Sequence, residues 1–196
     1  MLRRFGILIV VLGMTLNWAP PADAQAGDAS DSSEYLIKAG FIYNFAKFVE
    51  WPSASFSQAD SPIVIGVLGT DPFGSVLDRI VADKKIGSRG FVVKRFKWTK
   101  DLKDLKDCKI LFVSSSEKAH IDEIVQSVKG SPILTVGETP GFAERGGMIR
   151  FTLEDNRVRF EVNVDAARQA ELNISSRLLT LAKIIPQSAA TARNPG

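Results

Sequence analysis

Short apolar runs alternate with helical segments along the middle of the chain, and this alternation restricts the fold more than any other feature. The apolar runs occupy residues 63–68, 91–96, 110–113 and 133–136. They are rich in β-branched residues and short, which is typical of strands covered on both faces. Strands that alternate with helices favour right-handed crossovers and a mostly parallel sheet. The sequence therefore predicts an α/β fold, a three-layer sandwich.

Segments with helical periodicity lie between the predicted strands and at both ends of the domain. Helices are predicted at residues 35–51, 73–82, 114–129, 165–170 and 175–185. In the first of them Phe41, Phe45 and Phe48 share one face. Pro52 ends this helix, because the residue before a proline is pushed out of the helical region.

A hairpin is predicted near the C-terminal end of the sheet. Residues 148–153 and 158–162 read as strands, and the polar segment 154–157 between them reads as their turn. The hairpin, residues 148–162, should add antiparallel strands at one edge of the otherwise parallel sheet.

The N-terminus has the three parts of a cleavable signal peptide. Arg3 and Arg4 precede an apolar run at residues 5–16, and an Ala-Asp-Ala site ends at Ala24. We expect residues 1–24 to be removed and the protein to work outside the cytoplasm. Four segments are then predicted: the signal peptide at 1–24, a disordered lead-in at 25–33, a single domain at 34–186 and a disordered tail at 187–196.

Composition argues against several classes of function. Removal of the signal peptide lowers the formal charge from +3 to +2, and the basic residues are scattered in the sequence, which gives no indication of nucleic-acid binding. Cys108 is the only cysteine, so no internal disulfide can form. It is expected as a small packed residue, with an intermolecular bridge or a redox-responsive thiol as the alternative.

No catalytic constellation is visible. His120 is the only histidine and falls among polar helical residues, so we expect no metal site and no cofactor. The sequence contains neither a nucleophile-elbow motif nor a phosphate-binding loop. We therefore expect no enzyme activity and assign no catalytic residue.

Three loops at strand ends are candidates for a small-molecule site. In an open α/β sheet, ligands bind outside the carboxyl ends of the strands. The loops 69–74, 114–117 and 137–147 should meet there. Their candidate ligand-binding residues are Asp71, Ser115, Glu117, Glu138 and Arg145. The alternative is that these residues cap helices and shape turns.

The first helix suggests a partner interface. Tyr43 and Lys47 lie on its more polar side, and Trp51 stands at its end before a Ser-rich loop. Aromatic side chains exposed in this way are enriched at protein interfaces. The alternative is that the aromatic residues of this region belong to the core.

Two stretches resemble the YfiR-like family. Residues 35–52 (YLIKAGFIYNFAKFVEWP) resemble its opening helix, and residues 160–163 with 172–182 resemble its closing segment. The markers at 66–69, 73–74 and 146–149 follow in the same order, so the resemblance covers residues 34–185.

The resemblance implies a periplasmic α/β protein without catalytic activity. In that family the best-understood member represses a membrane-bound diguanylate cyclase by binding its periplasmic sensor region. An outer-membrane OmpA-like lipoprotein relieves that repression, and the repressor forms homodimers. Its internal disulfides cannot be transferred to this chain, since Cys108 has no partner.

Three functional hypotheses follow, of which a hydrolase with an unrecognised site ranks last because no nucleophile–base pair is apparent. The first is a regulatory binding protein that controls a diguanylate cyclase or another inner-membrane sensor, with residues 35–56 and the hairpin 148–162 as its surfaces. The second is a periplasmic small-molecule binding module that uses the strand-end loops. The family resemblance also implies a homodimer.

Overall fold

The computed structural model describes residues 23–186, with side chains from residue 33 onward. The predicted tail, 187–196, and all but the last two residues of the predicted signal peptide lie outside this range. The helices are α1 (Asp23–Phe48), α2 (Val76–Val81), α3 (Ile121–Val128), α4 (Val164–Gln169) and α5 (Ser176–Leu179), with short 3-10 helices at Ser53–Ser55, Lys103–Asp107 and Ser115–Glu117. The strands are β1 (Val49–Glu50), β2 (Ile63–Leu68), β3 (Phe91–Phe96), β4 (Ile110–Val113), β5 (Leu134–Gly137), β6 (Ile149–Glu154), β7 (Arg157–Val162), β8 (Asn173–Ile174) and β9 (Lys183–Ile184).

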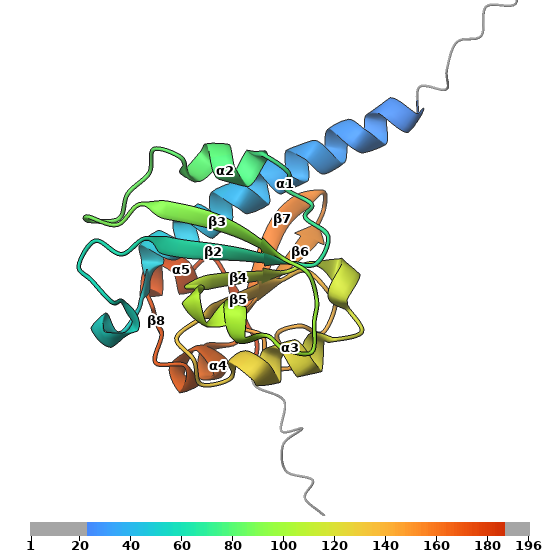
Figure 1. Cartoon of the computed structure of the whole chain (residues 1–196). Coiled ribbons are helices and arrows are strands. Elements are labelled where there is room, and N and C mark those ends of the chain that lie inside the picture. The colour runs from blue at the N-terminus through green and yellow to red at the C-terminus, as the bar shows by residue number, and fades with distance from the viewer. Residues whose placement is uncertain (1–22, 187–196) are drawn as a thin grey trace, which may run out of the picture.

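Seven of these strands form one sheet in the order β3-β2-β4-β5-β6-β7-β9. The pairs from β3 to β6 are parallel, β6 and β7 are antiparallel, and β9 runs parallel to the end of β7. Helices α1 and α2 cover one face, and α3 covers the other (Figure 1). The predicted α/β sandwich with a mostly parallel sheet is confirmed.

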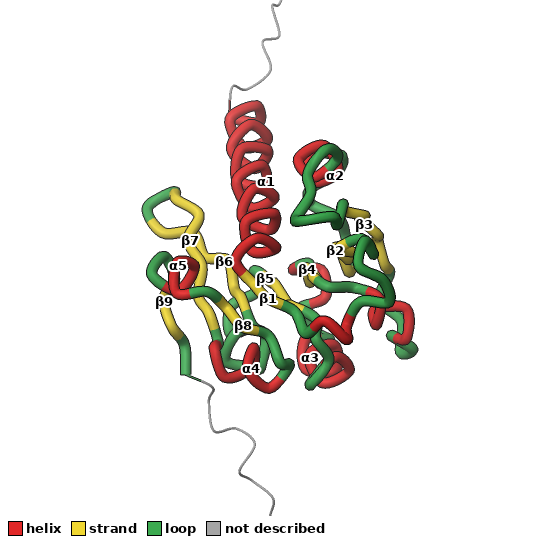
Figure 2. The backbone as a smooth tube through the Cα atoms, turned by 90° about the vertical axis from the view of Figure 1, so that its left-hand side faces the viewer, coloured by secondary structure: helices red, strands yellow, loops and turns green. Residues whose placement is uncertain are grey.

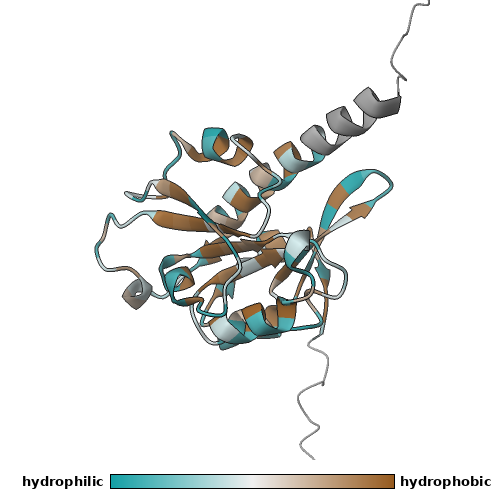
Figure 3. Cartoon of the chain, turned by 45° about the vertical axis from the view of Figure 1, so that its right-hand side comes forward, coloured by the Kyte–Doolittle hydropathy of each residue, from teal (hydrophilic) through white to brown (hydrophobic). Residues whose placement is uncertain are grey.

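Residue alternation divides the core between the two faces of the sheet. In β2 and β4 every side chain is buried, as expected for strands covered on both faces, and Figure 3 shows these central strands as continuously apolar. On the α1 face, the ring of Phe45 lies 5.7 Å from that of Phe151 and 5.2 Å from that of Phe160. This aromatic cluster fixes the first helix against the hairpin.

The α3 face is smaller and depends on close approach of backbone. Ile121, Ile124, Val125 and Val128 of α3 pack there around Leu111 and Phe142. A side chain at Gly66 of β2 would stand 2.7 Å from the sulfur of Cys108. Glycine at position 66 therefore leaves the room that the buried cysteine occupies.

The hairpin turn is tighter than the sequence predicted. Asp155 and Asn156 alone connect β6 to β7, both with positive φ, of 50° and 58°. Two such residues form the primed turn whose twist matches that of the flanking strands. Glu154 and Arg157, which the sequence placed in the turn, are instead the last strand pair.

Four segments differ from the sequence-based expectation. The predicted helix 114–129 is a 3-10 turn at Ser115–Glu117 followed by α3 from Ile121. Residues 25–33 belong to α1 instead of a disordered lead-in; extending a helix costs far less than nucleating one, and the Tyr35–Phe48 part is already held by packing. The same helix ends at Phe48 instead of Trp51, because β1 pairs with β8. The predicted helix 175–185 is only α5, because Lys183 and Ile184 join the sheet as β9 and extend its edge beyond the hairpin.

Candidate functional site

The switch in strand order lies between β2 and β4, where the sequence placed a ligand site. β3 follows β2 on one side of it, and β4 lies on the other, so the loops after β2 and β4 flank the crevice. These loops bond to each other: the Thr70 amide donates to the Ser116 hydroxyl at 3.0 Å, and that hydroxyl donates to Glu117 at 2.9 Å. Gly69, with φ of 95°, has no room for a side chain beside them. The polar groups at the switch point thus satisfy one another, with Ser115 exposed alongside.

Asp71 is held by a neighbouring strand. Its carboxylate accepts the Phe73 amide at 2.8 Å and the Arg95 side chain at 2.7 Å. The same guanidinium reaches Asp78 of α2 at 2.5 Å and the Gly74 carbonyl at 2.7 Å. The hydrogen bond from Arg95 lowers the pKa of Asp78 below its usual value of 3.8. Asp71 therefore shapes the turn before α2, which was the alternative expectation for it.

Glu138 belongs to a buried ionic cluster against α1. Lys38 donates to it at 2.6 Å and also contacts Glu34 at 2.5 Å, one turn earlier in the helix. The Tyr35 hydroxyl donates to Glu138 at 3.2 Å, and the Lys38 ammonium lies 4.5 Å from the centre of the Tyr35 ring. Lys38 is only 5% exposed. This cluster joins α1 to the end of β5. The role of Lys38 was not predicted, and the four-residue spacing from Glu34 is its one signal in the sequence.

Arg145 lies at a different place, beside a cavity of about 440 Å³. It donates to Asp122 of α3 at 2.6 Å, and this hydrogen bond lowers the pKa of the Asp122 carboxyl. The cavity is lined by α3, α4 and the loop before β6, with Val125 and Met148 among its apolar walls. Of the five candidate ligand residues, Arg145 alone lines this cavity.

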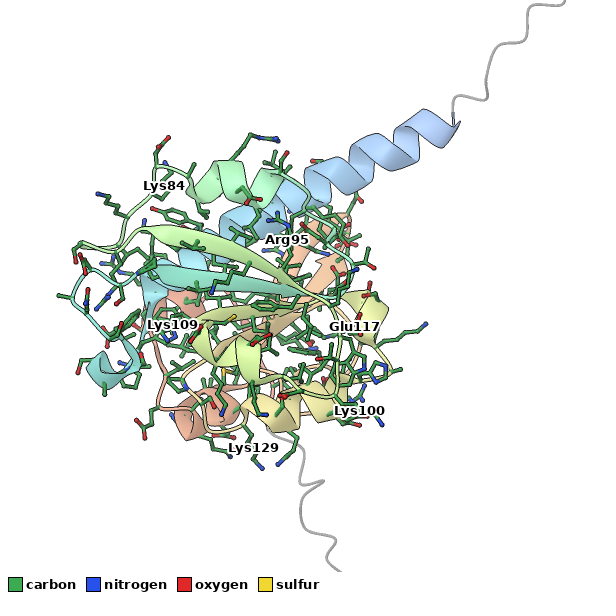
Figure 4. All side chains as sticks on the ribbon, in the orientation of Figure 1. Lys84, Arg95, Lys100, Lys109, Glu117 and Lys129 are labelled. Atoms are coloured by element: carbon green, nitrogen blue, oxygen red, sulfur yellow. The ribbon has the colours of Figure 1, made fainter. Side chains whose placement is uncertain are left out.

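The five candidate residues consequently do not form one cluster in the structure. Asp71 pairs with Arg95, Glu117 with Ser116, Glu138 with Lys38, and Arg145 with Asp122. Figure 4 shows Glu117 at the end of the sheet, at the carboxyl side of its parallel strands. Ligand binding by this set stays a prediction.

The three candidate interface residues lie along α1 and its exit. The Tyr43 ring packs edge-on against Phe91 at 5.7 Å, and the exposed Lys47 ammonium lies 5.7 Å from the Tyr43 ring. The Trp51 indole donates to the Lys109 carbonyl at 3.2 Å. Both aromatic rings are half-buried and pack against the core, so only part of each is available to a partner.

A second surface on α1 is more exposed. Phe41 packs on Phe160 at 5.4 Å, and Ile37 stands one helical turn before it on the same side. Leu153 continues the row of Phe151 along β6, since residues two apart share a face of a strand. Ile37 is 46% and Leu153 54% exposed. We call Ile37, Phe41 and Leu153 the helix–hairpin surface; it unites the two segments that the sequence suggested separately.

The side chains of Cys108 and His120 both pack against other parts of the protein. Cys108 is fully buried, and burial raises the pKa of its thiol to about 11. The folded protein therefore offers no thiol for an intermolecular bridge. The His120 ring stacks on Trp98 with centroids 4.4 Å apart. Among residues 23–186, no cluster of three His, Cys, Asp or Glu side chains is placed to hold a metal ion.

No helix in the described part of the chain is long and apolar enough to cross a membrane. In a comparison with known families, a family model described as YfiR/HmsC-like matches residues 35–183. This range is nearly the same as the one over which the motifs of the sequence resemble that family. No curated protein matches the chain.

Proposed function

Since the chain belongs to the YfiR/HmsC-like family, whose members are periplasmic regulators of diguanylate cyclases, we propose that it regulates a membrane-bound diguanylate cyclase by binding that enzyme's periplasmic sensor region. In this proposal the protein is non-catalytic and binds the inactive state of the enzyme more tightly than the active state. A preference of about 100-fold is enough to shift a balanced equilibrium almost completely.

The observation that best supports binding to a protein is the helix–hairpin surface. Ile37 and Leu153 expose apolar side chains on two elements that pack together through the ring of Phe41. Exposed apolar groups on rigid elements suit a protein interface better than they suit solvent. Tyr43 and Lys47 lie further along the same helix, Trp51 follows it after β1, and all three extend the proposed interface toward β3.

The experiment measures cyclic-di-GMP in cells that carry or lack the gene. Deletion is expected to raise the nucleotide several-fold, and complementation is expected to restore it. Complementation with Ile37→Glu and Leu153→Glu together is expected to fail, because two carboxylates would be desolvated in the interface. The control is Leu181→Glu, at an apolar residue after α5 that is 66% exposed, more than either of the two test residues. An unchanged nucleotide level after deletion would contradict the proposal.

Two further family properties belong to the same proposal. An outer-membrane OmpA-like lipoprotein would relieve repression by competing for this protein, and a homodimer would present two binding surfaces. Mixing the purified protein with the periplasmic domain of such a lipoprotein tests the first property. Sedimentation of the purified protein tests the second.

The cavity beside Arg145 supports small-molecule binding as a second candidate function. Its volume of about 440 Å³ is within the range of ordinary ligand sites, and its walls combine apolar side chains with charges of both signs. A thermal-shift screen of periplasmic metabolites tests it: a ligand at 100 times its dissociation constant adds about 2.7 kcal/mol of stability. Val125→Trp, which places a larger side chain in the cavity, should remove any shift that depends on this site.

A further inference from the structure

The strand β3 forms one free edge of the sheet. Figure 2 shows it as the outermost strand on the side opposite the hairpin, and among the residues that the structure describes its only ladder partner is β2. The Ile63 amide donates to the Gly90 carbonyl at 2.9 Å, and the Gly69 amide donates to the Phe96 carbonyl at 2.9 Å. In a regular parallel ladder the even-numbered residues of β3 therefore face β2.

The odd-numbered residues Phe91, Val93 and Arg95 consequently direct their backbone N–H and C=O groups away from the sheet. Within residues 23–186, none of these six groups has a backbone partner. The strand is six residues long, and its pairing with β2 continues in register without a bulge. Such an edge is a template for a further strand unless the protein blocks it.

The opposite edge of the sheet is partly paired by another strand of the chain. There β9 pairs with Glu161 and Val162 of β7, and the Ile185 amide donates to the Val162 carbonyl at 2.9 Å. The C-terminal half of β7 is thus covered by the chain itself. The unpaired edge of β3 is therefore longer than the unpaired part of β7.

The charge of the residues near β3 indicates what kind of strand could pair with it. Residues 84–107 comprise β3 and the segments on either side of it in the sequence, and contain nine lysines and arginines against three aspartates, a formal charge of +6 in a chain whose total is +3. Of these basic residues, Arg95 pairs with Asp71 and Asp78, and Lys94 lies 4.0 Å from Asp107. Lys84, Lys85, Lys94 and Lys97 are all exposed around the strand, and Figure 4 shows Lys84 and Arg95 toward its two ends. A second copy of the chain would bring two such segments together, so self-pairing is opposed by charge.

We propose that the β3 edge binds an acidic, extended segment of a partner protein as an added strand. The backbone groups of Phe91, Val93 and Arg95 supply the hydrogen bonds, and the surrounding lysines select for carboxylates. The exposed side chains of Val92 and Lys94 contact alternate residues of the incoming strand. This inference does not depend on the regulation of a diguanylate cyclase, and it can hold or fail separately.

The probe is a fluorescein-labelled synthetic octapeptide in which Glu alternates with Val or Thr, tested by fluorescence anisotropy against the purified protein. Binding is expected at low ionic strength and should weaken by about 10-fold in 0.5 M NaCl, where exposed charges are screened. The same peptide with Lys in place of Glu should not bind. Absence of binding of the acidic peptide at millimolar concentration, or equal binding of both peptides, overturns the proposal.

Two variants at one position separate strand pairing from charge attraction. Val93→Pro removes an amide that points away from β2, a position where edge strands tolerate proline. Val93→Ala removes the side chain and keeps the amide. We expect at least a 10-fold loss of affinity for Val93→Pro relative to Val93→Ala. Equal affinities would show attraction without pairing and would overturn the added strand.

Two further measurements complete the test. Lys94→Gln with Lys97→Gln should weaken binding several-fold, whereas Lys129→Gln, beyond α3, should not. If Val93→Pro does not fold, amide exchange in the unmodified protein decides: the Val93 amide should be protected only when the peptide is present. Binding to phosphatidylglycerol vesicles without binding to the peptide would assign the basic edge to a lipid surface instead.

Discussion

The two edges of the sheet each carry an ion-pair network with one central charge and two partners, and the networks differ in burial. At the β3 edge, Arg95 is 40% exposed and binds Asp71 and Asp78. At the other edge, Glu161 is 3% exposed and binds Arg150 of β6 at 2.7 Å and Lys183 of β9 at 3.0 Å. The same arrangement of charges thus stabilises a surface turn in one place and closes the sheet in the other.

Burial decides how much each network contributes to stability. An exposed ion pair is screened by water and contributes little, whereas removing one partner of a buried pair leaves an unsatisfied charge. The closed edge should therefore respond strongly to substitution and the open edge weakly. An open edge of this kind is free to change its partners without a large effect on the fold.

The largest effect is expected for Glu161→Gln. The change keeps the shape but leaves Arg150, itself mostly buried, without its counter-charge, and should lower the free energy of unfolding by about 3 kcal/mol. Urea unfolding followed by circular dichroism measures it, with the exposed Glu154→Gln on the same hairpin as control. A loss below about 1 kcal/mol would mean that the two edges are equivalent.

The decrease in the free energy of unfolding at acidic pH should depend on Glu161 as well. Burial acts to raise the pKa of Glu161, but hydrogen bonds and charges from Arg150 and Lys183 outweigh it and hold the pKa below the usual 4.5. A carboxylate with a lowered folded pKa stabilises the protein above its unfolded pKa and stops doing so as pH falls through the folded value. The stability difference between the unmodified protein and Glu161→Gln should therefore be constant from pH 7 to about 5.5 and decline below pH 4.5. A difference that grows on acidification would contradict this sign.

A smaller effect is expected for Arg95→Gln at the open edge. Because the guanidinium is well exposed, the free energy of unfolding should fall by about 0.5–1 kcal/mol. In 1 M NaCl most of that difference should disappear, since screening shortens the reach of exposed charges. The difference caused by Glu161→Gln should survive the same salt. If both differences respond equally to salt, burial does not distinguish the two networks.

The smallest effect is expected for Lys183→Met. Lys183 is 68% exposed, and Glu161 keeps its bond to Arg150 when the lysine is replaced. Thermal unfolding should show a loss of no more than about 0.5 kcal/mol, with Lys129→Met as the control. A loss as large as that of Glu161→Gln would indicate that β9, rather than the hairpin pair, holds the edge.

Much of the fold was predictable because strands and amphipathic helices each have a characteristic spacing of apolar residues along the sequence. The strands at 63–68, 91–96 and 110–113 were predicted with the boundaries that the structure has. Short pairings were not predictable: β1 with β8 and β9 with β7 involve two residues each, which is too short for a periodic pattern. Residues 175–185 therefore read as one helix, although Lys183 and Ile184 belong to the sheet.

The candidate site was less predictable than the fold. The rule for open α/β sheets located the loops at the strand ends correctly, but it could not tell whether their polar groups were free. Asp71 and Glu138 are each satisfied by a residue distant in sequence, Arg95 at 24 positions and Lys38 at 100 positions. Neither partner carries a signal in its own neighbourhood that would identify it.

By itself, the sequence determined the elements, the alternation that makes the sheet parallel, the absence of an internal disulfide and the resemblance to the YfiR/HmsC-like family. These follow from local spacing, composition and motifs. Only the tertiary structure decided which charges are buried and paired, that α1 and the hairpin form one surface, and that the strand 91–96, flanked by basic residues in the sequence, lies at an open edge of the sheet. The physical reason is that these properties depend on crossovers that bring distant segments together. Local sequence patterns do not predict which strand a crossover places next to which.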